Sequence, residues 1–320
     1  MGEHFKVKIA DCDHESIDIE RSILRDISPD IPWLRCKTED DVIAQCSDAQ
    51  ALLIQYVPMT DRVFENLPNL RVLVRYGVGV DTVDLEAAAR RKIVVSNVPD
   101  YGTEEVSDHA LALILSLSRK IQEANAFIHR GTWDFRTITP VRRLQTLTLG
   151  VIGLGRIGSA LARKAHGIGI KIVAYDPYRD KTTIPEYVRM IPLDGLLNAS
   201  DVVSIHCPLN DETRNLLDEH RLGLMKTDAF LINTARGSIV NEVALEKALS
   251  QGRIAGAALD VFSKEPVLRD HPLLRFPNFI CTPHMAWYSE ESKLELKRKA
   301  AEEARRVLMG ETPKYQVNRF

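Results

Sequence analysis

The sequence lacks the features that mark several large classes of protein. Its five cysteines are odd in number and scattered, with neither the paired spacing of a zinc site nor the density of a disulfide framework. Lysine and arginine number 42 against 44 aspartate and glutamate, so the formal net charge of -2 offers no electrostatic footprint for nucleic acid. No uncharged apolar stretch is long enough to span a membrane or to form the core of a signal peptide. We therefore expect a cytoplasmic protein with reduced thiols, no bound metal, and neither a nucleic acid nor a membrane as direct partner.

The chain has a globular composition and is long enough for two domains. It has 320 residues, of which 45% are hydrophobic and 27% are charged, and we find no internal repeat or low-complexity tract. Two domains imply a cleft, which is where a small-molecule ligand is expected to bind.

Short apolar runs alternate with helix-compatible segments along most of the chain. In the first part, strands are expected in KVKIADC, in ALLIQY from Ala51, in RVLVRY from Arg71 and in KIVVSNV from Lys92. A second series has strands in TLGVIG, KIVAYD, VVSIHC, AFLINTA, IAGAALDV and NFICTP. This rhythm predicts an α/β protein with two doubly wound parallel-sheet domains, Rossmann-like or flavodoxin-like, and an active-site cleft between them.

Two long helices are expected outside these series. After Pro99, one continuous amphipathic helix is predicted from Glu104 to about Arg130, with apolar residues at helical spacing from Val106 to Ile121. A charged helix with an apolar stripe is predicted over residues 290–309 and should lead back to the first domain.

A glycine-rich turn opens the second series. In VIGLGRIG, Gly153 permits a tight turn, Gly155 lets the backbone approach a pyrophosphate, and Gly158 lets the helix pack on the strand. The next strand ends in Asp176, whose carboxylate can accept hydrogen bonds from both ribose hydroxyls and would repel a 2′-phosphate. NAD is therefore the expected cofactor, and the nearby Arg179 leaves NADP as the alternative. The alternative is a glycine turn that serves packing alone. We predict an NAD-binding domain over residues 102–287 and a substrate domain over residues 1–101 plus 288–320.

Polar residues follow the later strands of the second series, at the sheet edge where ligands of open α/β sheets bind. Reduction of a 2-oxo acid by NADH needs a cation for the carboxylate, a proton donor, and a partner that tunes the donor. Arg236 follows AFLINTA with a planar fork suited to a carboxylate, Asp260 and Glu265 follow the next strand, and His284 follows NFICTP. Singly they could be a surface arginine, a turn former, a solvated glutamate, and a core or capping histidine. Jointly they favour an active site.

The segments NTARGS, ALDVFSKEP and TPHMAW, after GLGRIG in this order, resemble the D-isomer-specific 2-hydroxyacid dehydrogenases, and the similarity runs along nearly the whole chain. The resemblance implies that Arg236 binds the substrate carboxylate and that His284 is the proton donor and acceptor. Glu265 would hydrogen-bond His284 and support its protonated form. The expected activity is NAD-dependent reduction of a small 2-oxo acid such as hydroxypyruvate, glyoxylate or phosphohydroxypyruvate, by a homodimer formed through the long helix after Pro99.

The same resemblance carries over a set of binding residues. Those expected to contact the cofactor are Gly153, Gly155, Arg156, Ile157, Gly158, Asp176, His206, Cys207, Pro208, Thr213, Thr234, Ala235 and Asp260. RYGVGVD from Arg75 looks like the substrate loop of the family, with the backbone N–H groups of Val78 and Gly79 facing the carboxylate. The alternative is a glycine turn that merely closes a strand.

Within the family, Arg75 together with PHMAWYSE most resembles the C-terminal binding proteins, which are corepressors that bind NAD(H). Trp287 would then line the substrate pocket, or else pack in the core at the start of the last helix. The sequence departs from that branch at Met285, where a smaller residue is usual, and at Gln145–Thr146, where a glycine-containing turn is usual. Arg75 favours a second anionic group on the substrate, whereas Trp287 and Met285 favour an apolar tail.

Two other functions fit the same residues. One is an NAD(H)-sensing scaffold, or corepressor-like binding protein, with vestigial dehydrogenase activity. The chain begins almost directly on a strand and ends at Phe320 soon after the last helix, which favours the enzyme over the scaffold. The other is a formate or phosphonate-type dehydrogenase that acts on a one-centre anion. Trp287 and Arg75 argue against it, because they suggest room beyond the carboxylate.

Overall fold

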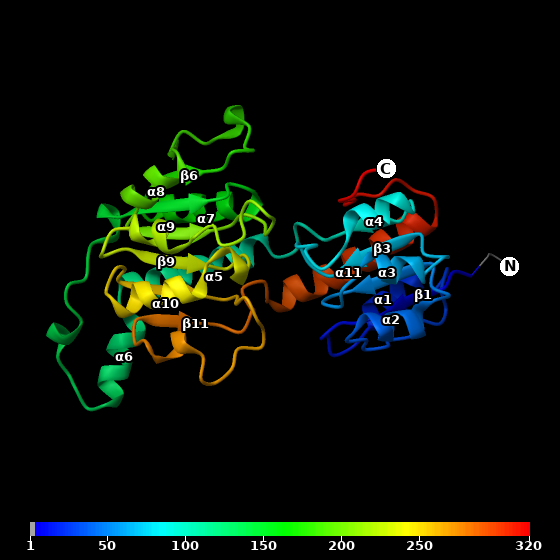
Figure 1. Ribbon diagram of the computed structural model, residues 1–320, viewed down its shortest axis with the longest axis horizontal. Coiled ribbons are helices and arrows are strands. Elements are labelled where there is room, and N and C mark those ends of the chain that lie inside the picture. The colour runs from blue at the N-terminus through cyan, green and yellow to red at the C-terminus, as the bar shows by residue number, and fades with distance from the viewer. Residues whose placement is uncertain (1–3) are drawn as a thin grey trace. The chain divides into compact units, whose positions relative to one another are not determined.

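The computed structural model describes residues 4–320, which fold into two compact units, each with its own parallel sheet (Figure 1). The first unit comprises residues up to Gly102 together with Ser289–Phe320, and the second is Thr103–Tyr288. The predicted fold class, α/β with two doubly wound parallel-sheet domains, is confirmed.

The first unit is a parallel sheet with helices packed against it. Its strands pair in the order β1 (Val7–Ile9), β2 (Ala51–Ile54), β3 (Val72–Arg75) and β4 (Val94–Ser96). Its helices are α1 (Asp18–Leu24), α2 (Glu39–Cys46), α3 (Asp61–Glu65), α4 (Leu85–Arg90) and α11 (Glu290–Leu308). The C-terminal helix α11 packs against α1, β2 and β3, so the end of the chain completes the core of its first part.

The winding of the first sheet changes direction at β1. Ile9 forms a parallel bridge with Trp33 on one side of β1, whereas β2 pairs along the other side. The chain therefore moves outward from β1 to the Trp33 segment and then crosses over to β2. In open α/β sheets, the crevice at the carboxyl ends of such strands is where ligands bind.

The second unit holds the larger sheet. Its strands are β5 (Thr148–Ile152), β6 (Lys171–Tyr175), β7 (Val188–Met190), β8 (Val202–Ile205), β9 (Phe230–Asn233), β10 (Gly256–Leu259) and β11 (Phe279–Cys281), in the order β11-β10-β9-β8-β5-β6-β7. Its α-helices are α5 (Thr103–Ser118), α6 (Ile121–His129), α7 (Arg156–Gly167), α8 (Leu193–Ala199), α9 (Glu219–Gly223) and α10 (Glu242–Ser250). Short 3-10 helices are η1 (Phe135–Ile138), η2 (Leu144–Thr146), η3 (Lys181–Thr183), η4 (Gly237–Ile239) and η5 (Pro272–Arg275).

Nearly all strands lie where the sequence pattern predicts them, because strands buried on both faces read as continuous apolar runs. The exception is β7, which the pattern did not predict. It has three residues at the edge of the sheet, and only Val188 among them is buried. So short an edge strand carries too little periodicity to be recognised.

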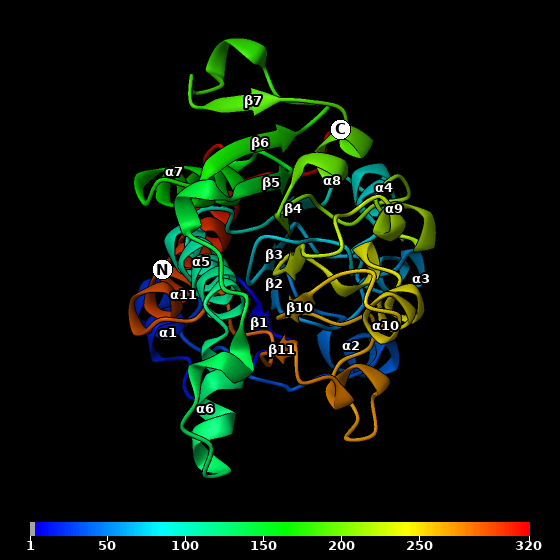
Figure 2. The same cartoon turned by 90° about the vertical axis from the view of Figure 1, so that its left-hand side faces the viewer.

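The prediction of one continuous helix from Glu104 to about Arg130 is wrong. Helix α5 ends at Ser118 and α6 begins at Ile121, because Lys120 between them takes a left-handed backbone conformation with φ of 52°. The apolar stripe of α5 is buried as expected, whereas α6 contains no buried residue. Figures 1 and 2 show α6 running away from the seven-stranded sheet.

Candidate active site

His284 and Glu265 form a hydrogen-bonded pair at the carboxyl ends of β11 and β10. His284 follows β11 in a left-handed backbone conformation, with φ of 54°, and its Nδ1 lies 2.7 Å from Glu265 Oε2. The other carboxylate oxygen, Oε1, accepts the N–H of Phe262 at 2.8 Å. Both carboxylate oxygens are therefore fixed, one of them by the histidine ring.

The pair has the electrostatics of an acid/base device. Burial raises the pKa of Glu265, but the hydrogen bonds from His284 and from Phe262 N–H, with the charge of Arg236, outweigh it and hold the pKa below its ordinary value. Because a carboxylate only accepts, Nδ1 of His284 carries the proton of the shared bond. Nε2 is then the ring nitrogen that can exchange a proton with a ligand.

Arg236 lies on the turn after β9, beside this pair. Asn233, fully buried, accepts the N–H of Ala235 at 3.0 Å and donates to the carbonyl of Arg236 at 2.8 Å, which fixes the turn. Gly237 lies against the loop that carries Glu265, because a Cβ on it would come within 1.9 Å of the Phe262 backbone. The structure thus brings Arg236 to the same place as His284 and Glu265, at three adjacent strand ends.

Asp260 holds the loop that carries His284 through hydrogen bonds to residues 284–286. Its side chain is 1% exposed, and it accepts the N–H of Met285 on Oδ1 and that of Ala286 on Oδ2, both at 2.9 Å. Its carbonyl accepts the N–H of His284 at 2.9 Å. Both carboxylate oxygens of Asp260 thus accept hydrogen bonds from the protein itself, and the predicted contact of Asp260 with the cofactor stays a prediction.

The glycine-rich turn between β5 and α7 forms a cradle that fits a dinucleotide pyrophosphate. Among residues 4–320, no side chain caps α7, so its first N–H groups, at Arg156 and Ile157, stay available. Apart from its chain neighbours and its own helix, no described atom lies within 4 Å of where a Cβ on Gly155 would be. Gly153, with φ of 90°, meets the end of β8, and Gly158 lies against the carbonyl of Gly153. The backbone is thus open on its ligand side.

Asp176 is tied to this cradle. Its carboxylate accepts the N–H of Leu154 at 2.8 Å and that of Tyr178 at 3.0 Å, which places it beside the phosphate turn. Each oxygen retains a lone pair for a ribose hydroxyl. The position fits the ribose-binding acid of a dinucleotide site.

The segment after β8 borders the same sheet edge. Burial lowers the pKa of His206 to about 4, and its Nε2 lies 2.8 Å from Ser204 Oγ, so the ring is neutral near pH 7. Burial likewise raises the pKa of the Cys207 thiol to about 11. Thr213 bridges the loop by donating to the carbonyl of Pro208 at 2.7 Å.

Thr234 and Ala235, at the end of β9, complete the edge. The hydroxyl oxygen of Thr234 is buried and has no hydrogen-bond partner among the described residues. An unpaired buried hydroxyl costs free energy unless a ligand or water satisfies it. A cofactor lying along this edge would supply such a partner.

The candidate substrate loop belongs to the first unit, after β3. In residues 4–320, the backbone N–H groups of Val78 and Gly79 donate no hydrogen bond, so they are available to an anion. The loop is anchored by Tyr76, whose buried hydroxyl donates to Glu20 at 3.0 Å. Glu20 lies 3.6 Å from Lys297 of α11. Arg75 is the last residue of β3 and directly precedes the loop.

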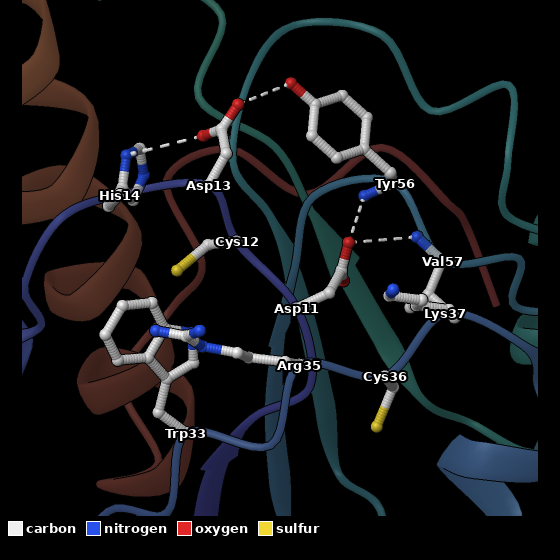
Figure 3. A pocket seen from close by; sticks show the side chains of 10 residues that line it. All are labelled: Asp11, Cys12, Asp13, His14, Trp33, Arg35, Cys36, Lys37, Tyr56 and Val57. Carbon is white, nitrogen blue, oxygen red and sulfur yellow. Dashed lines mark hydrogen bonds and ion pairs between the residues drawn. The ribbon is translucent and has the colours of Figure 1, made fainter. Parts of the chain in front are cut away.

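A pocket of about 490 Å³ lies in the first unit at the carboxyl ends of β1 and β2, where the winding of the sheet changes direction (Figure 3). Arg35 lies over the Trp33 ring, 4.7 Å from its centroid, and Lys37 lines another side. Tyr56 donates to Asp13 at 2.9 Å, and both side chains line the pocket. Nothing in the sequence pattern indicated this pocket.

Trp287 and Met285 lie in the segment that follows His284. Trp287 is half-buried and packs edge-on against Tyr288, with ring centroids 5.7 Å apart, which fits either a pocket wall or local packing. Met285 is exposed. Among residues 4–320, no group of three or more histidine, cysteine, aspartate or glutamate side chains could hold a metal ion.

The geometry is that of a dinucleotide site with an acid/base pair and a neighbouring guanidinium, and comparison with known proteins agrees. The model of the D-isomer-specific 2-hydroxyacid dehydrogenase, NAD-binding domain, matches residues 111–286. A glyoxylate reductase from Korarchaeum cryptofilum is 40% identical over 283 residues, which cover 87% of this chain and 85% of the relative. The chain belongs to the D-isomer-specific 2-hydroxyacid dehydrogenase family. It is an NAD-dependent oxidoreductase that acts on the CH–OH group.

Two further relatives show how well the whole dehydrogenase fits the family. A hydroxypyruvate reductase from Blautia hydrogenotrophica is 35% identical over 285 residues, which cover 88% of each chain. The solved structure of an NADPH-dependent glyoxylate/hydroxypyruvate reductase from Sinorhizobium meliloti, with NADP and malonate, has a TM-score of 0.87 at 28% identity and covers 98% of this chain and 97% of that chain. The closer resemblance to the C-terminal binding proteins stays a prediction, because the family match does not separate its branches.

Sequence reasoning missed several residues that shape the site of the dehydrogenase. Asn233 and Gly237 hold the Arg236 turn, and Thr282 and His109 contact Asp260. A buried asparagine at a strand end and a glycine next to an arginine were the available signals. His109 gave none, because its partner is distant in sequence.

Proposed function

We propose that the enzyme reduces a small 2-oxo acid, with His284 as the proton donor to the carbonyl oxygen and Arg236 as the anchor for the carboxylate. The observation that carries this proposal is the 2.7 Å contact between His284 Nδ1 and Glu265, beside the Arg236 turn. NADH, when bound, supplies the hydride to the carbonyl carbon. The carbonyl oxygen takes its proton from His284 Nε2 while Arg236 polarises the carbonyl, and Glu265 stabilises the protonated ring.

We propose that the second unit binds NAD and the first unit binds the substrate. The uncapped start of α7 and the open Gly155 backbone support a pyrophosphate there, and Asp176 supports the ribose. The remaining proposed cofactor contacts are Gly153, Arg156, Ile157, Gly158, His206, Cys207, Pro208, Thr213, Thr234, Ala235 and Asp260. On the substrate side, the free N–H groups of Val78 and Gly79, with Arg75, support carboxylate binding.

The proposed substrates are glyoxylate and hydroxypyruvate, with phosphohydroxypyruvate as a related possibility. The names of the curated relatives support the first two. Arg75 lies near the pocket of the first unit, because its charge acts on Asp11 and Tyr56, which both line that pocket. Arg35 and Lys37 line that pocket together with Asp11 and Asp13. Asp11 accepts the backbone N–H groups of residues 55–57, which leaves the two cations to favour a 2-oxo acid with a second anionic group over one with an apolar tail. Trp287, if it lines the substrate pocket, would instead favour a 2-oxo acid with an apolar tail.

We also propose a homodimer that works in the cytoplasm. Four large apolar side chains on α6 and the segment after it are exposed: Ile121 (56%), Ile128 (46%), Trp133 (89%) and Phe135 (76%). A cluster of this kind on a protruding element is typical of a protein interface. All five cysteines are free thiols, as is usual for proteins of reducing compartments. Within residues 4–320, none of the helices is long and apolar enough to span a membrane.

The substrate proposal is tested by NADH oxidation with glyoxylate, hydroxypyruvate, 2-oxo acids with apolar tails and 2-oxo dicarboxylic acids. We expect turnover of the first two and a lower KM for the dicarboxylic acids than for the apolar ones. Arg35→Gln should raise the KM of the dicarboxylic acids alone, whereas Arg253→Gln, in the second unit, should change none. NADH binding without turnover of any acid would favour the scaffold instead.

A further inference from the structure

Helix α5 carries His109, which contacts Thr282 just before the catalytic candidate His284. His109 Nε2 lies 3.0 Å from the hydroxyl of Thr282, and that hydroxyl lies 2.5 Å from Asp260 Oδ1. The ring nitrogen is also 3.8 Å from Asp260 Oδ1 itself. The side chain of Asp260 is 1% exposed and that of His109 is 19% exposed, so the chain of contacts is largely shielded from water.

The direction of these hydrogen bonds follows from their inventory. A threonine hydroxyl has one proton, and Thr282 gives it to the carboxylate of Asp260, which can only accept. His109 must therefore donate from Nε2 to the hydroxyl oxygen. The result is a continuous relay of donors from α5 through Thr282 to a buried carboxylate, which needs such donors because a buried charge without them is costly.

Asp260 also holds the segment that carries the acid/base histidine. Its two oxygens accept the N–H groups of Met285 and Ala286, and its carbonyl, with that of Thr282, accepts the N–H of His284. These bonds fix His284 in a left-handed conformation, with φ of 54°, that residues other than glycine rarely adopt. The conformation persists only while its surroundings enforce it.

We propose that His109 is a positioning residue, which acts through Thr282 and Asp260 to keep His284 aligned with Glu265. It touches neither substrate nor cofactor in this role. The proposal rests on the proposed function of His284 as the acid/base residue. The relay runs from a helix that begins the second unit to a loop near its end, so it also braces that loop against α5, which packs on β9 and β10.

The test is a double-mutant cycle on the whole enzyme with His109→Ala and Thr282→Val, measured as kcat, KM and the Kd for NADH. Each single change should lower kcat by about 10- to 100-fold, the cost of a small misplacement of a catalytic group, while the Kd for NADH changes little. The double variant should be no worse than the poorer single variant, because both changes break one relay. His109→Gln and Thr282→Ser, which keep a donor at each position, should recover most of kcat. His220→Ala and Thr227→Val, at exposed positions, are the matched controls.

Three results would overturn the proposal: unchanged kcat in both folded single variants, losses that simply multiply in the double variant, or no recovery with His109→Gln and Thr282→Ser. If His109→Ala does not fold, Thr282→Val and the two conservative variants decide the same question. His284→Gln, measured in the same experiment, separates a failure of the proposed function from a failure of the role proposed for His109. Full activity in His284→Gln would contradict the proposed function itself, whereas its inactivity beside fully active relay variants would contradict only the role of His109.

Discussion

At the scale of single residues, the proposed chemistry depends on the charge of Glu265. Its pKa is held below the ordinary value because the bonds from His284 and Phe262 N–H outweigh burial. A carboxyl group with a lowered pKa stays charged above its ordinary value, about 4.3, and loses its charge only as the pH falls through the lowered one. Glu265 is therefore ionised throughout the range in which the enzyme is expected to work.

Glu265→Gln keeps the shape of this side chain and removes its charge. We expect kcat to fall by roughly 10- to 100-fold, since a hydrogen bond to a charged group contributes about 1.5–3 kcal/mol. The ratio of wild-type to variant kcat should shrink once the pH falls below the lowered pKa of Glu265, where the wild type loses this charge too. A pH series of kcat for the two proteins measures this. A ratio that grows steadily as the pH falls would argue against the assigned role.

The proposed preference for NADH over NADPH depends on one charge, the carboxylate of Asp176. Asp176 is held beside the phosphate turn by the N–H of Leu154, where its carboxylate would repel a 2′-phosphate. Asp176→Asn should raise kcat/KM for NADPH by about tenfold relative to NADH, equal to about 1.4 kcal/mol of discrimination. Asp194→Asn, at an exposed position of α8, should leave the ratio unchanged. An unaltered ratio in Asp176→Asn would mean that another group excludes the phosphate.

How far the sequence predicts these residues depends on where their partners lie. Arg236, Glu265 and His284 stand in recognisable segments just after strands, so their types and order suggested a site. Thr282 and His109 could not be found in that way, because His109 lies 173 positions from Thr282 and only the fold joins them. Contacts at such separation leave no periodicity or motif in a single sequence.

At the scale of elements, the site depends on how closely two loops approach each other. The turn after β9 and the loop after β10 touch at Gly237, where a Cβ would lie 1.9 Å from the Phe262 backbone. Any side chain there must push Arg236 away from Glu265, or the reverse. The glycine of NTARGS therefore serves the approach of the two loops, a role that the motif alone does not reveal.

Gly237→Ala should lower both activity and stability. We expect a loss of about 1–3 kcal/mol in the free energy of unfolding, as for other overpacked sites, together with a clear fall in kcat/KM. Denaturant unfolding and steady-state kinetics measure the two effects. Gly195→Ala is the matched control, since no atom lies within 4 Å of its new Cβ and alanine favours a helix such as α8. Equal behaviour of the two variants would contradict the close approach.

The break between α5 and α6 could not be predicted from the hydrophobic pattern. The stripe from Val106 to Ile121 keeps its helical spacing across Arg119 and Lys120, so it hides the break between α5 and α6. The break depends on one backbone angle at Lys120, a residue with no preference for the left-handed region. Hydrophobic periodicity predicts which face of a helix is apolar, but it does not predict the residue at which the helix ends.

At the scale of the whole molecule, the fold class was predictable because buried parallel strands and the helices between them alternate regularly in the sequence. The association of subunits stays a prediction. The amphipathic helix expected to form the dimer contact is divided, and its buried part, α5, lies within the second unit, whereas α6 and the segment after it hold the exposed apolar residues. The proposed homodimer contact therefore moves to α6.

The double variant Trp133→Ser with Phe135→Ser should convert the proposed dimer into a monomer, because these are two of the most exposed large apolar side chains of the segment after α6. Sedimentation equilibrium or light scattering over a range of concentrations measures the change. Val243→Ser, which alters an exposed apolar residue on α10, should leave the mass unchanged. A monomeric wild type, or a variant that stays dimeric, would refute the contact.

The most direct measurement is a single turnover of bound NADH with glyoxylate or hydroxypyruvate, comparing the wild type with His284→Gln. If His284 donates the proton to the carbonyl oxygen, the variant should bind NADH with an unchanged Kd while its rate of NADH oxidation falls by about 10²–10⁴-fold, the usual contribution of general acid catalysis. A variant that binds NADH and oxidises it at the wild-type rate would show that another group supplies the proton.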